Sequence, residues 1–172
     1  MESDRLFHDL YTGIHWCQEH LQMFGKQIPA PRLTAWHGDV GKSYTYSRLT
    51  HHPQPWTAPL TLIRKRIEPI AQVQFNGVLL NLYRNGNDSM AWHSDDEPEL
   101  GPNPIIGSVS LGGTRHFRFR HRYQKANPVG VNLTHGSLLI MGGSTQHFWQ
   151  HQLAKTSRPV RPRINLTFRV IR

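Results

Sequence analysis

Apolar side chains recur along the first third of the chain with the period of a helix. From Phe7 onward they are spaced by three and four residues, which predicts an amphipathic helix over residues 5–22. The members of this stripe are Phe7, Leu10, Ile14, Cys17 and Leu21. A second, shorter stripe from Leu60 to Ile70 follows Pro59, and proline favours the first turn of a helix. The pattern therefore predicts two helices before residue 75.

The remainder of the chain shows the two-residue alternation of strands, interrupted by turn residues. The predicted strands are 75–84, 105–111, 115–122, 136–141, 145–151 and 163–171. Residues 85–104 contain Gly, Asn, Asp and Pro without apolar periodicity, so we expect a long loop, and such loops are usually functional. Two early helices followed by many short strands predict an α+β, mainly β fold: a double-stranded β-helix (jelly roll) with helices packed on one side.

Length and charge narrow the possibilities further. A chain of 172 residues is long enough for one core, so we expect a single domain over 1–172. The formal net charge is +9, and residues 101–172 contain no Asp or Glu but eleven Lys or Arg. Such a one-sided charge favours a polyanionic partner, most simply nucleic acid, although charge that only keeps the protein soluble is the alternative.

Cysteine content and hydropathy indicate where the protein acts. The single cysteine, Cys17, excludes an internal disulfide framework and suits a reducing compartment. No apolar stretch approaches the ~20 residues that a membrane span requires, and the N-terminus lacks a basic-then-apolar signal pattern. We therefore expect no membrane partner and a location in the cytoplasm, or in the nucleus if the source is eukaryotic. We also expect a monomer.

His93 and Asp95 are two residues apart and would point to the same side of an extended segment. A third ligand must come from further along the chain, where His135, His147 and His151 are candidates. We favour His151 because it precedes the C-terminal arginines, on a strand expected to neighbour theirs. Two imidazoles and one carboxylate are the ligand set of non-haem Fe(II) oxygenases. Catalytic zinc uses similar ligands, so the choice of metal depends on the arginines.

The last predicted strand alternates cleanly between polar and apolar residues. The polar face carries Arg163, Asn165, Thr167 and Arg169. Arginines on a buried face are costly unless they bind anions, and a guanidinium matches a carboxylate with two hydrogen bonds. The two arginines would lie about 20 Å apart at Cα, and we expect their side chains to converge on a dicarboxylate. Asn81 and Tyr83 add polar groups at the same two-residue spacing in another predicted strand. The alternative for the last strand is an exposed edge strand whose outer face carries basic residues.

Several stretches together resemble the AlkB family of Fe(II)- and 2-oxoglutarate-dependent nucleic-acid dealkylases. They are Asn81-Leu82-Tyr83, His93-Ser94-Asp95-Asp96-Glu97, Ile106-Gly107-Ser108-Val109-Ser110-Leu111-Gly112, Arg118-Phe119-Arg120-His121, His135-Gly136-Ser137-Leu138-Leu139, His151 and Pro162-Arg163-Ile164-Asn165-Leu166-Thr167-Phe168-Arg169. The resemblance runs from about Pro31 to Arg172, and its final stretch is highly specific.

The resemblance implies a cofactor site in a jelly-roll core. It implies iron on His93, Asp95 and His151, with O2 as the second co-substrate. It also implies 2-oxoglutarate on two arginines and several neutral polar residues, namely Arg163, Arg169, Asn81, Tyr83 and Thr167, to which we add Asn165 from the same face. The implied substrates are bases alkylated on ring nitrogens, such as 1-methyladenine and 3-methylcytosine.

The resemblance further implies contacts to nucleic acid, centred on a nucleotide-recognition segment at about 23–50. Within it, Trp36 or His37 would stack on a flipped base, and Phe24 would fill the gap that the base leaves. Asp96 matches a position that contacts the exocyclic amine of the base. Further candidates for substrate contacts are Arg32, Glu97, Arg118 and Arg120. Charge alone suggests phosphate contacts by Arg115, Arg118, Arg120, Arg122, Lys125, Arg158 and Arg161.

The expected function is direct repair: oxidative demethylation of alkylated bases in DNA, or alternatively in RNA, with release of formaldehyde and succinate. Two other classes of function stay open. The same site could serve a 2-oxoglutarate oxygenase that acts on a protein or a small molecule, although this does not explain the acid-free, basic second half. The chain could also be a non-catalytic binder of nucleic acid that keeps the fold.

Overall fold

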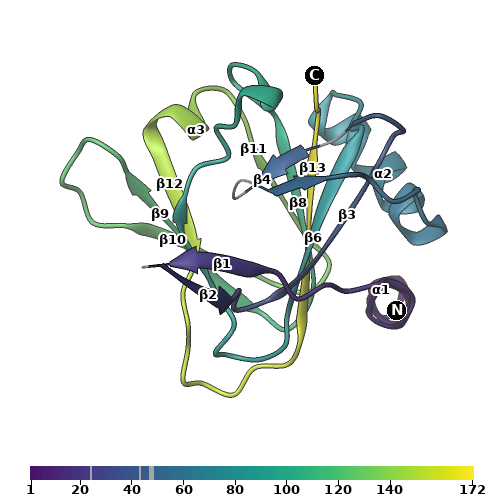
Figure 1. Cartoon of the computed structure of the whole chain (residues 1–172), viewed down its shortest axis with the longest axis horizontal. Coiled ribbons are helices and arrows are strands. Elements are labelled where there is room, and N and C mark those ends of the chain that lie inside the picture. The colour runs from purple at the N-terminus through teal and green to yellow at the C-terminus, as the bar shows by residue number, and fades with distance from the viewer. Residues whose placement is uncertain (24, 43, 47–48) are drawn as a thin grey trace.

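Two antiparallel sheets face each other in the computed structural model, which describes residues 1–23, 25–42, 44–46 and 49–172 (Figure 1). The larger sheet has the order β11 (Ser137–Met141), β8 (Ile106–Gly112), β13 (Arg163–Arg169), β6 (Gly77–Tyr83) and β3 (Leu33–Gly38). The smaller sheet has the order β10 (Val129–Leu133), β9 (Arg115–His121), β12 (Trp149–Leu153) and β7 (Met90–His93). This arrangement is the double-stranded β-helix that the sequence predicted.

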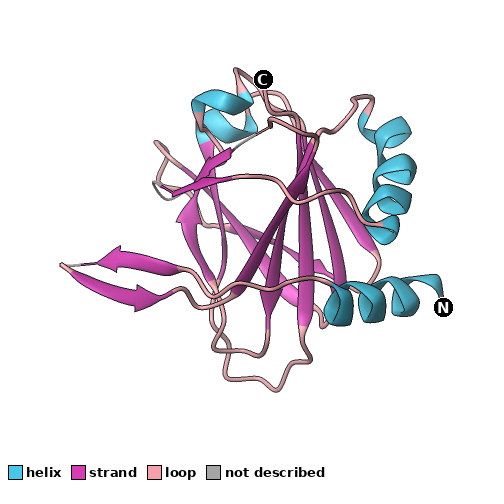
Figure 2. Cartoon of the chain, turned by 45° about the vertical axis from the view of Figure 1, so that its right-hand side comes forward, coloured by secondary structure: helices cyan, strands magenta, loops and turns pink. Residues whose placement is uncertain are grey.

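The main core lies between the larger sheet and two helices, α1 (Glu2–Gly13) and α2 (Ala58–Ala71). Both helices cover the same side of that sheet, as predicted (Figure 2). Alternate residues of the central strands, such as Leu80 and Leu166, point to the helices and are fully buried against side chains such as Leu10 and Leu60. Their neighbours in sequence point to the space between the sheets, because a strand directs successive side chains to opposite faces.

The first helix is shorter than predicted. It ends at Gly13 rather than at residue 22, and Ile14 is extended while its N–H donates to the carbonyl of Leu10. Glycine has low helix propensity, so the chain leaves the helix there although the apolar stripe continues. Cys17 instead forms an isolated bridge with Thr34, and Leu21 lies in β1 (His20–Met23). The second helix begins next to Pro59 as expected.

Two hairpins lie between the helices, so the prediction of helices first and strands afterwards was wrong. The first consists of β1 and β2 (Lys26–Pro29) and projects from the body of the molecule (Figure 2). The second consists of β4 (Tyr44–Tyr46) and β5 (Leu49–His51). All residues of β2 are exposed, and a strand that packs neither face against a core shows no apolar alternation.

Three segments of the second half also differ from the prediction. One is β10, a mostly exposed strand that was not predicted. The expected loop 85–104 contains β7 and a short 3-10 helix, η1 (Pro98–Leu100), so His93 lies at the end of a strand. The expected strand 145–151 begins as the short helix α3 (Thr145–Phe148) and becomes β12 at Trp149. Within the described ranges, none of the helices combines the length and apolar character that a membrane span requires.

Candidate metal and co-substrate site

A cavity between the two sheets brings together every residue predicted to hold the metal or the co-substrate. Its lining includes His93, Asp95 and His151 from the side of the smaller sheet. It also includes the inward-facing polar residues of β6 and β13, which are Asn81, Tyr83, Arg163, Asn165, Thr167 and Arg169. The predicted alternation of the last strand is thereby confirmed, since its four polar residues share one face.

His93, Asp95 and His151 form the only group of this kind among the described residues, with ligand atoms all within 4.8 Å of one another. The choice of His151 therefore matches the structure, but the reason for it was wrong. β12 pairs with β7 and β9 in the smaller sheet, and the arginine strand β13 belongs to the opposite sheet. His151 is directly opposite His93 in the β12–β7 pairing, which brings the two imidazoles together.

The other two candidate histidines have different surroundings. Nδ1 of His135 accepts a hydrogen bond from the N–H of Gly112 at 2.8 Å, and its Nε2 lies 3.2 Å from a carboxylate oxygen of Asp4 in α1. His147 is exposed on α3. Neither belongs to the cluster of potential ligands.

The hydrogen bonds of the triad suit metal binding. Nδ1 of His93 lies 2.8 Å from the carbonyl of Ala91, so the proton sits on this nitrogen and Nε2 is left as an electron-pair donor. That Nε2 lies 3.8 Å from Oδ1 of Asp95, and Nε2 of His151 lies 3.7 Å from Oδ2. Burial and then the neighbouring His93 lower the pKa of His151 to about 4, so its imidazole is neutral at physiological pH, as a ligand must be.

Asp95 is ionised although it is almost fully buried. Burial alone would raise the pKa of Asp95, but the positive charge of Arg169 outweighs it, assisted by His151 and His93, and holds the pKa well below its usual range. Nη2 of Arg169 donates a hydrogen bond to Oδ1 at 2.8 Å, and both side chains are buried. The site thus supplies a buried anion beside the neutral imidazole of His151.

The two arginines that were expected to converge on a dicarboxylate line the same cavity but have different surroundings. Arg169 lies at the end of β13 that meets the metal ligands, where Asp95 engages it. Arg163 lies at the other end of the strand, beside Tyr83, whose ring centroid is 5.3 Å from its guanidinium carbon. The arginines therefore mark opposite ends of the cavity.

Arg163 is the residue best placed to receive a carboxylate. It is 2% exposed, and no carboxylate in the described part of the chain forms an ion pair with it. Its Nη2 donates to Oγ of Ser110 at 2.9 Å, while its Nε has no hydrogen-bond partner there. Burial lowers the pKa of Arg163 to about 10, so the group stays charged at neutral pH. A buried guanidinium without an anion is costly, so the site fits an anionic ligand.

The neutral polar residues of the cavity are already held by the protein. Asn165 Nδ2 donates to Oγ of Ser108 at 2.8 Å, and the hydroxyl of Thr167 donates to Oδ1 of Asn165 at 3.1 Å. Oδ1 of Asn81 accepts a hydrogen bond from Nε of Arg32 at 3.1 Å. Each candidate is therefore fixed in orientation before a ligand enters.

Gln146, which no sequence pattern indicated, positions a metal ligand. This side chain is 1% exposed, and its Oε1 accepts a hydrogen bond from the backbone N–H of Asp95 at 2.9 Å. No spacing or motif indicates such a role. Ser108 and Ser110 were also missed, although two inward serines alternating with apolar residues in the buried strand β8 are a visible signal.

The predicted base-stacking residues are not available for stacking. Trp36 is 4% exposed, and its ring packs so closely on β6 that a Cβ at Gly77 would lie 2.5 Å from it. His37 is 3% exposed, and its Nδ1 lies 2.7 Å from the carbonyl of Pro55. Both belong to β3, which is an integral strand of the larger sheet. The proposed wedge, Phe24, lies outside the described residues.

Two of the predicted substrate residues lie near the metal triad. Asp96 follows Asp95 and is half-exposed, and its Oδ2 is 3.1 Å from Nη1 of Arg122. Glu97 is partly buried next to it. Arg32, by contrast, is 3% exposed and is directed into the protein toward Asn81, so it does not present a guanidinium to the surface.

Three predicted nucleic-acid contacts lie away from the cavity. Arg118 and Arg120 point to the outer face of the smaller sheet, because their neighbours Phe117 and Phe119 point inward against His151. Arg120 donates to Oε1 of Gln150 and lies over the ring of Trp92 at 4.5 Å. Arg115 is buried, and its guanidinium donates to three backbone carbonyls, so the expected phosphate contact was wrong.

The geometry defines a class: a jelly roll whose cavity joins a His-x-Asp…His triad to a buried arginine is the site of an Fe(II)- and 2-oxoglutarate-dependent oxygenase. A model described as "2OG-Fe(II) oxygenase superfamily" matches residues 1–169. The alpha-ketoglutarate-dependent dioxygenase alkB homolog 3 of Bos taurus is 44% identical over 99% of this chain and 62% of its own length. The DNA oxidative demethylase ALKBH2 of Mus musculus is 40% identical over 99% of this chain and 75% of its own length.

The chain belongs to the AlkB family within the 2OG-Fe(II) oxygenase superfamily. It spans about 62% of the length of the bovine relative, and three quarters of the murine one. The solved structure of OsALKBH1 aligns with a TM-score of 0.66 at 18% identity, over 98% of this chain and 91% of that one, which shows a shared fold. The cofactor and co-substrates of this family are Fe(II), 2-oxoglutarate and O2, as its names state and as the triad fits.

Proposed function

We propose that this chain repairs alkylated DNA directly, by oxidative demethylation of bases such as 1-methyladenine and 3-methylcytosine. The observation that carries the proposal is the cavity itself, in which three potential iron ligands and an unpaired buried arginine line one space. The similarity to a DNA oxidative demethylase and the acid-free, basic second half of the chain support a nucleic-acid substrate.

In this proposal His93, Asp95 and His151 hold iron from one side. Arg169 keeps Asp95 ionised, and Gln146 fixes its backbone, so the carboxylate is oriented before the metal binds. Phe117 and Phe119 pack on His151 with ring centroids 5.2 and 6.1 Å away and exclude water from that ligand. Bound Fe(II) would supply the oxidation of the N-methyl carbon, with O2 and 2-oxoglutarate as co-substrates. 2-Oxoglutarate would be converted to succinate and CO2, and the hydroxylated methyl group would be released as formaldehyde.

We assign the distant carboxylate of 2-oxoglutarate to Arg163. The hydroxyl of Tyr83 and the amides of Asn81 and Asn165 line the same cavity and orient the co-substrate between the arginine and the metal ligands. Burial raises the pKa of Tyr83, so this hydroxyl stays protonated and can donate a hydrogen bond to a carboxylate. The interaction with Arg163 thus holds the co-substrate in position, and the metal ligands need not move.

The experiment that tests the proposal starts from an oligonucleotide carrying one 1-methyladenine. The protein is incubated with it, Fe(II), 2-oxoglutarate and O2, and the product is weighed by mass spectrometry. A loss of one methylene mass that requires 2-oxoglutarate supports repair. Succinate without that loss would contradict the nucleic-acid substrate and favour an oxygenase acting on a protein or small molecule. Neither product would favour a non-catalytic binder.

The proposal also covers the type of nucleic acid, the oligomeric state and the location of the protein. DNA is the substrate that the relatives' names support, and RNA is the alternative to be compared with a matched oligonucleotide. We propose that the chain acts as a monomer in the cytoplasm, or in the nucleus of a eukaryote. Sedimentation of the protein at working concentrations tests the first of these statements.

A further inference from the structure

A row of aromatic rings leads from the metal ligands to the surface along one face of β9. Phe117, Phe119 and His121 alternate with outward-facing arginines, so the three rings point to the same side of the strand. Phe117 and Phe119 contact each other with centroids 5.1 Å apart, and both contact His151. The row therefore begins at the proposed iron site.

At its outer end the row widens into a cluster that we call the aromatic rim: His121, Tyr123, Phe148 and Trp149. His121 and Phe148 are stacked with an interplanar angle of 17° and centroids 5.9 Å apart. Trp149 lies 5.2 Å from His121, and Tyr123 lies 6.4 Å from Phe148. Two of these rings are nevertheless open to solvent, since Tyr123 is 73% and Phe148 is 44% exposed.

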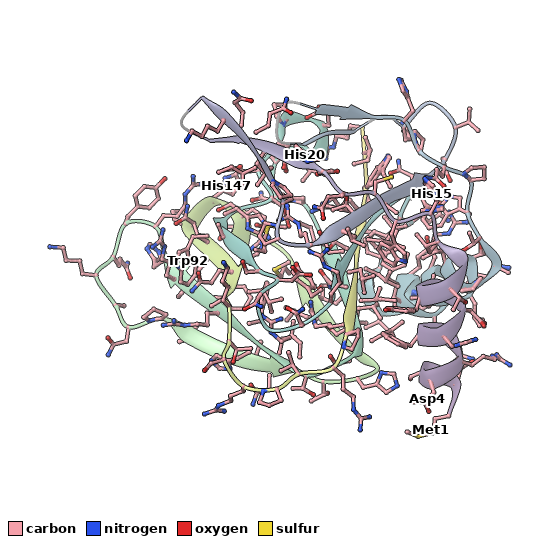
Figure 3. All side chains as sticks on the ribbon, turned by 60° about the horizontal axis from the view of Figure 1, so that its bottom comes forward. Met1, Asp4, His15, His20, Trp92 and His147 are labelled. Atoms are coloured by element: carbon pink, nitrogen blue, oxygen red, sulfur yellow. The ribbon has the colours of Figure 1, made fainter. Side chains whose placement is uncertain are left out.

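The aromatic rim lies at the metal end of the cavity. The hydroxyl of Ser94 donates to the carbonyl of Trp149 at 2.8 Å, one residue before the ligand Asp95. Figure 3 places His147, the neighbour of Phe148, and Trp92, the neighbour of His93, on one side of the molecule, away from Met1 and Asp4 at the start of α1. A strand bound at the metal site would thus pass the rim, whereas it would not reach α1.

The charges around the rim suit an anionic chain. Arg122 and Lys125 are exposed and lie within two residues of Tyr123 in sequence, and residues 101–172 contribute no carboxylate side chain. Asp96 is the nearby acidic residue, and Arg122 pairs with it. Exposed rings next to cationic side chains are the composition that binds single-stranded nucleic acid, because bases stack on the rings and phosphates meet the charges.

We propose that the aromatic rim, chiefly Phe148 and Tyr123, is a stacking platform for unpaired bases that flank the target base. This proposal rests on the proposed nucleic-acid substrate and extends it to single strands. Bases in a duplex are already stacked on each other and do not offer their faces, so the rim selects substrates whose neighbouring bases are unpaired. An apolar protein partner is less well matched, because two cationic side chains, Arg122 and Lys125, accompany the two exposed rings.

The test compares binding of an unmodified single strand of about twelve nucleotides to the wild-type chain, Phe148→Leu and Tyr123→Ala, by fluorescence anisotropy. We expect each variant to bind about tenfold more weakly, and the loss to be smaller for the same sequence as a duplex and for a dinucleotide. Tyr123→Phe keeps the ring and should restore binding. Tyr11→Ala, which removes an exposed ring from α1, is the matched control and should bind like the wild type.

Two outcomes overturn the platform: variants that bind the single strand as tightly as the wild type, or an equal loss on single strand and duplex. Circular dichroism of each variant shows whether it is folded, and both substituted side chains are exposed. Failure of the proposed function has a different signature, because wild-type protein would then leave 1-methyladenine unchanged while binding still depended on the rings. Quenching of tryptophan fluorescence by the bound strand gives a second readout that does not depend on catalysis, and the part of it that Trp149→Phe abolishes reports on the rim.

Discussion

At the scale of single residues, substitution of Arg163 should affect co-substrate binding much more than it affects the stability of the fold. Arg163→Gln should weaken 2-oxoglutarate binding roughly 30-fold or more, because truncating one partner of a buried charge pair costs about 2–5 kcal/mol. The free protein should lose little stability, since the substitution also removes a buried charge that no carboxylate of the described chain neutralises. Calorimetric titration with 2-oxoglutarate measures the first effect and thermal unfolding the second.

Arg66→Gln is the control for this prediction, because Arg66 is exposed on α2 and lies outside the cavity. An unchanged affinity of Arg163→Gln for 2-oxoglutarate would show that Arg163 does not bind the dicarboxylate. In the wild type, saturating 2-oxoglutarate should raise the melting temperature, as any ligand of the folded state does. In Arg163→Gln that rise should largely disappear at the same concentration.

Gln146 is predicted to act on the metal through Asp95. Gln146→Leu removes the acceptor of the Asp95 N–H, and loss of such an outer partner typically weakens metal binding by about 10- to 100-fold. Titration with Co(II), followed by its visible absorbance, measures this without turnover. Gln150→Leu removes a glutamine that binds Arg120 on the outer face of β12 and should leave the titration unchanged. Equal effects of both substitutions would indicate a general loss of folding.

The triad could be predicted from sequence, whereas its surroundings could not. His93 and Asp95 are close in sequence, so local geometry is enough to pair them, and the C-terminal stretch pointed to the arginines. The ion pair of Arg169 with Asp95 joins residues 74 positions apart and depends on which sheet each strand enters. Gln146 and the stacking of His121 on Phe148 depend on tertiary packing in the same way.

At the scale of elements, the turn after β6 depends on the carboxylate of Asp88. It accepts hydrogen bonds from the N–H of Arg84 at 2.8 Å and from its guanidinium at 2.8 and 2.9 Å. Asp88→Asn should therefore lower the free energy of unfolding by about 1–3 kcal/mol at pH 7, the usual range for a buried charged group that loses its partner. Urea unfolding of both proteins measures the difference.

The pH dependence of that difference follows from the pKa of Asp88. Burial would raise this pKa, but the hydrogen bonds and charge of Arg84 lower it below the usual value near 3.8. A depressed carboxyl pKa stabilises the fold above the unfolded value of about 3.9, and the stabilisation is lost as the pH falls through the folded value. The difference between wild type and Asp88→Asn should thus be constant from pH 5 to 7 and shrink below about pH 4. If the difference in unfolding free energy persisted in acid, the effect of Asp88→Asn would come from packing rather than from the charge of Asp88.

Most elements that pack one face on the core could be predicted, and exposed ones were missed; β3 is the exception, a buried strand that was not predicted. β6, β8 and β13 alternate because one face meets the helices and the other the cavity. The exposed β2 and the four-residue β7, set among turn residues, lack such a pattern. The first helix was predicted too long because the apolar residues beyond Gly13 continue the helical spacing while belonging to a bridge and a hairpin.

At the scale of the whole molecule, the fold separates the cavity between the sheets from the basic outer face of the smaller sheet. The fold class could be derived from strand patterns together with the family resemblance, but the distribution of charge over the two faces of the smaller sheet could not. Its inner face contains the metal ligands and the phenylalanines. Its outer face carries Arg118 and Arg120, and a groove beside them is lined by Lys155 and Arg158.

This charge distribution predicts a steep dependence of nucleic-acid binding on salt. Each phosphate contacted on a single strand contributes a slope of about −0.7 to log K against log salt, because binding releases condensed counterions. Lys155→Gln and Arg158→Gln should each reduce the slope by roughly that amount if a strand crosses the groove that they line. Arg66→Gln, on the helical side, should leave it unchanged. A slope near zero in the wild type would show that phosphates contribute little to binding, and the basic half of the chain would then serve solubility alone.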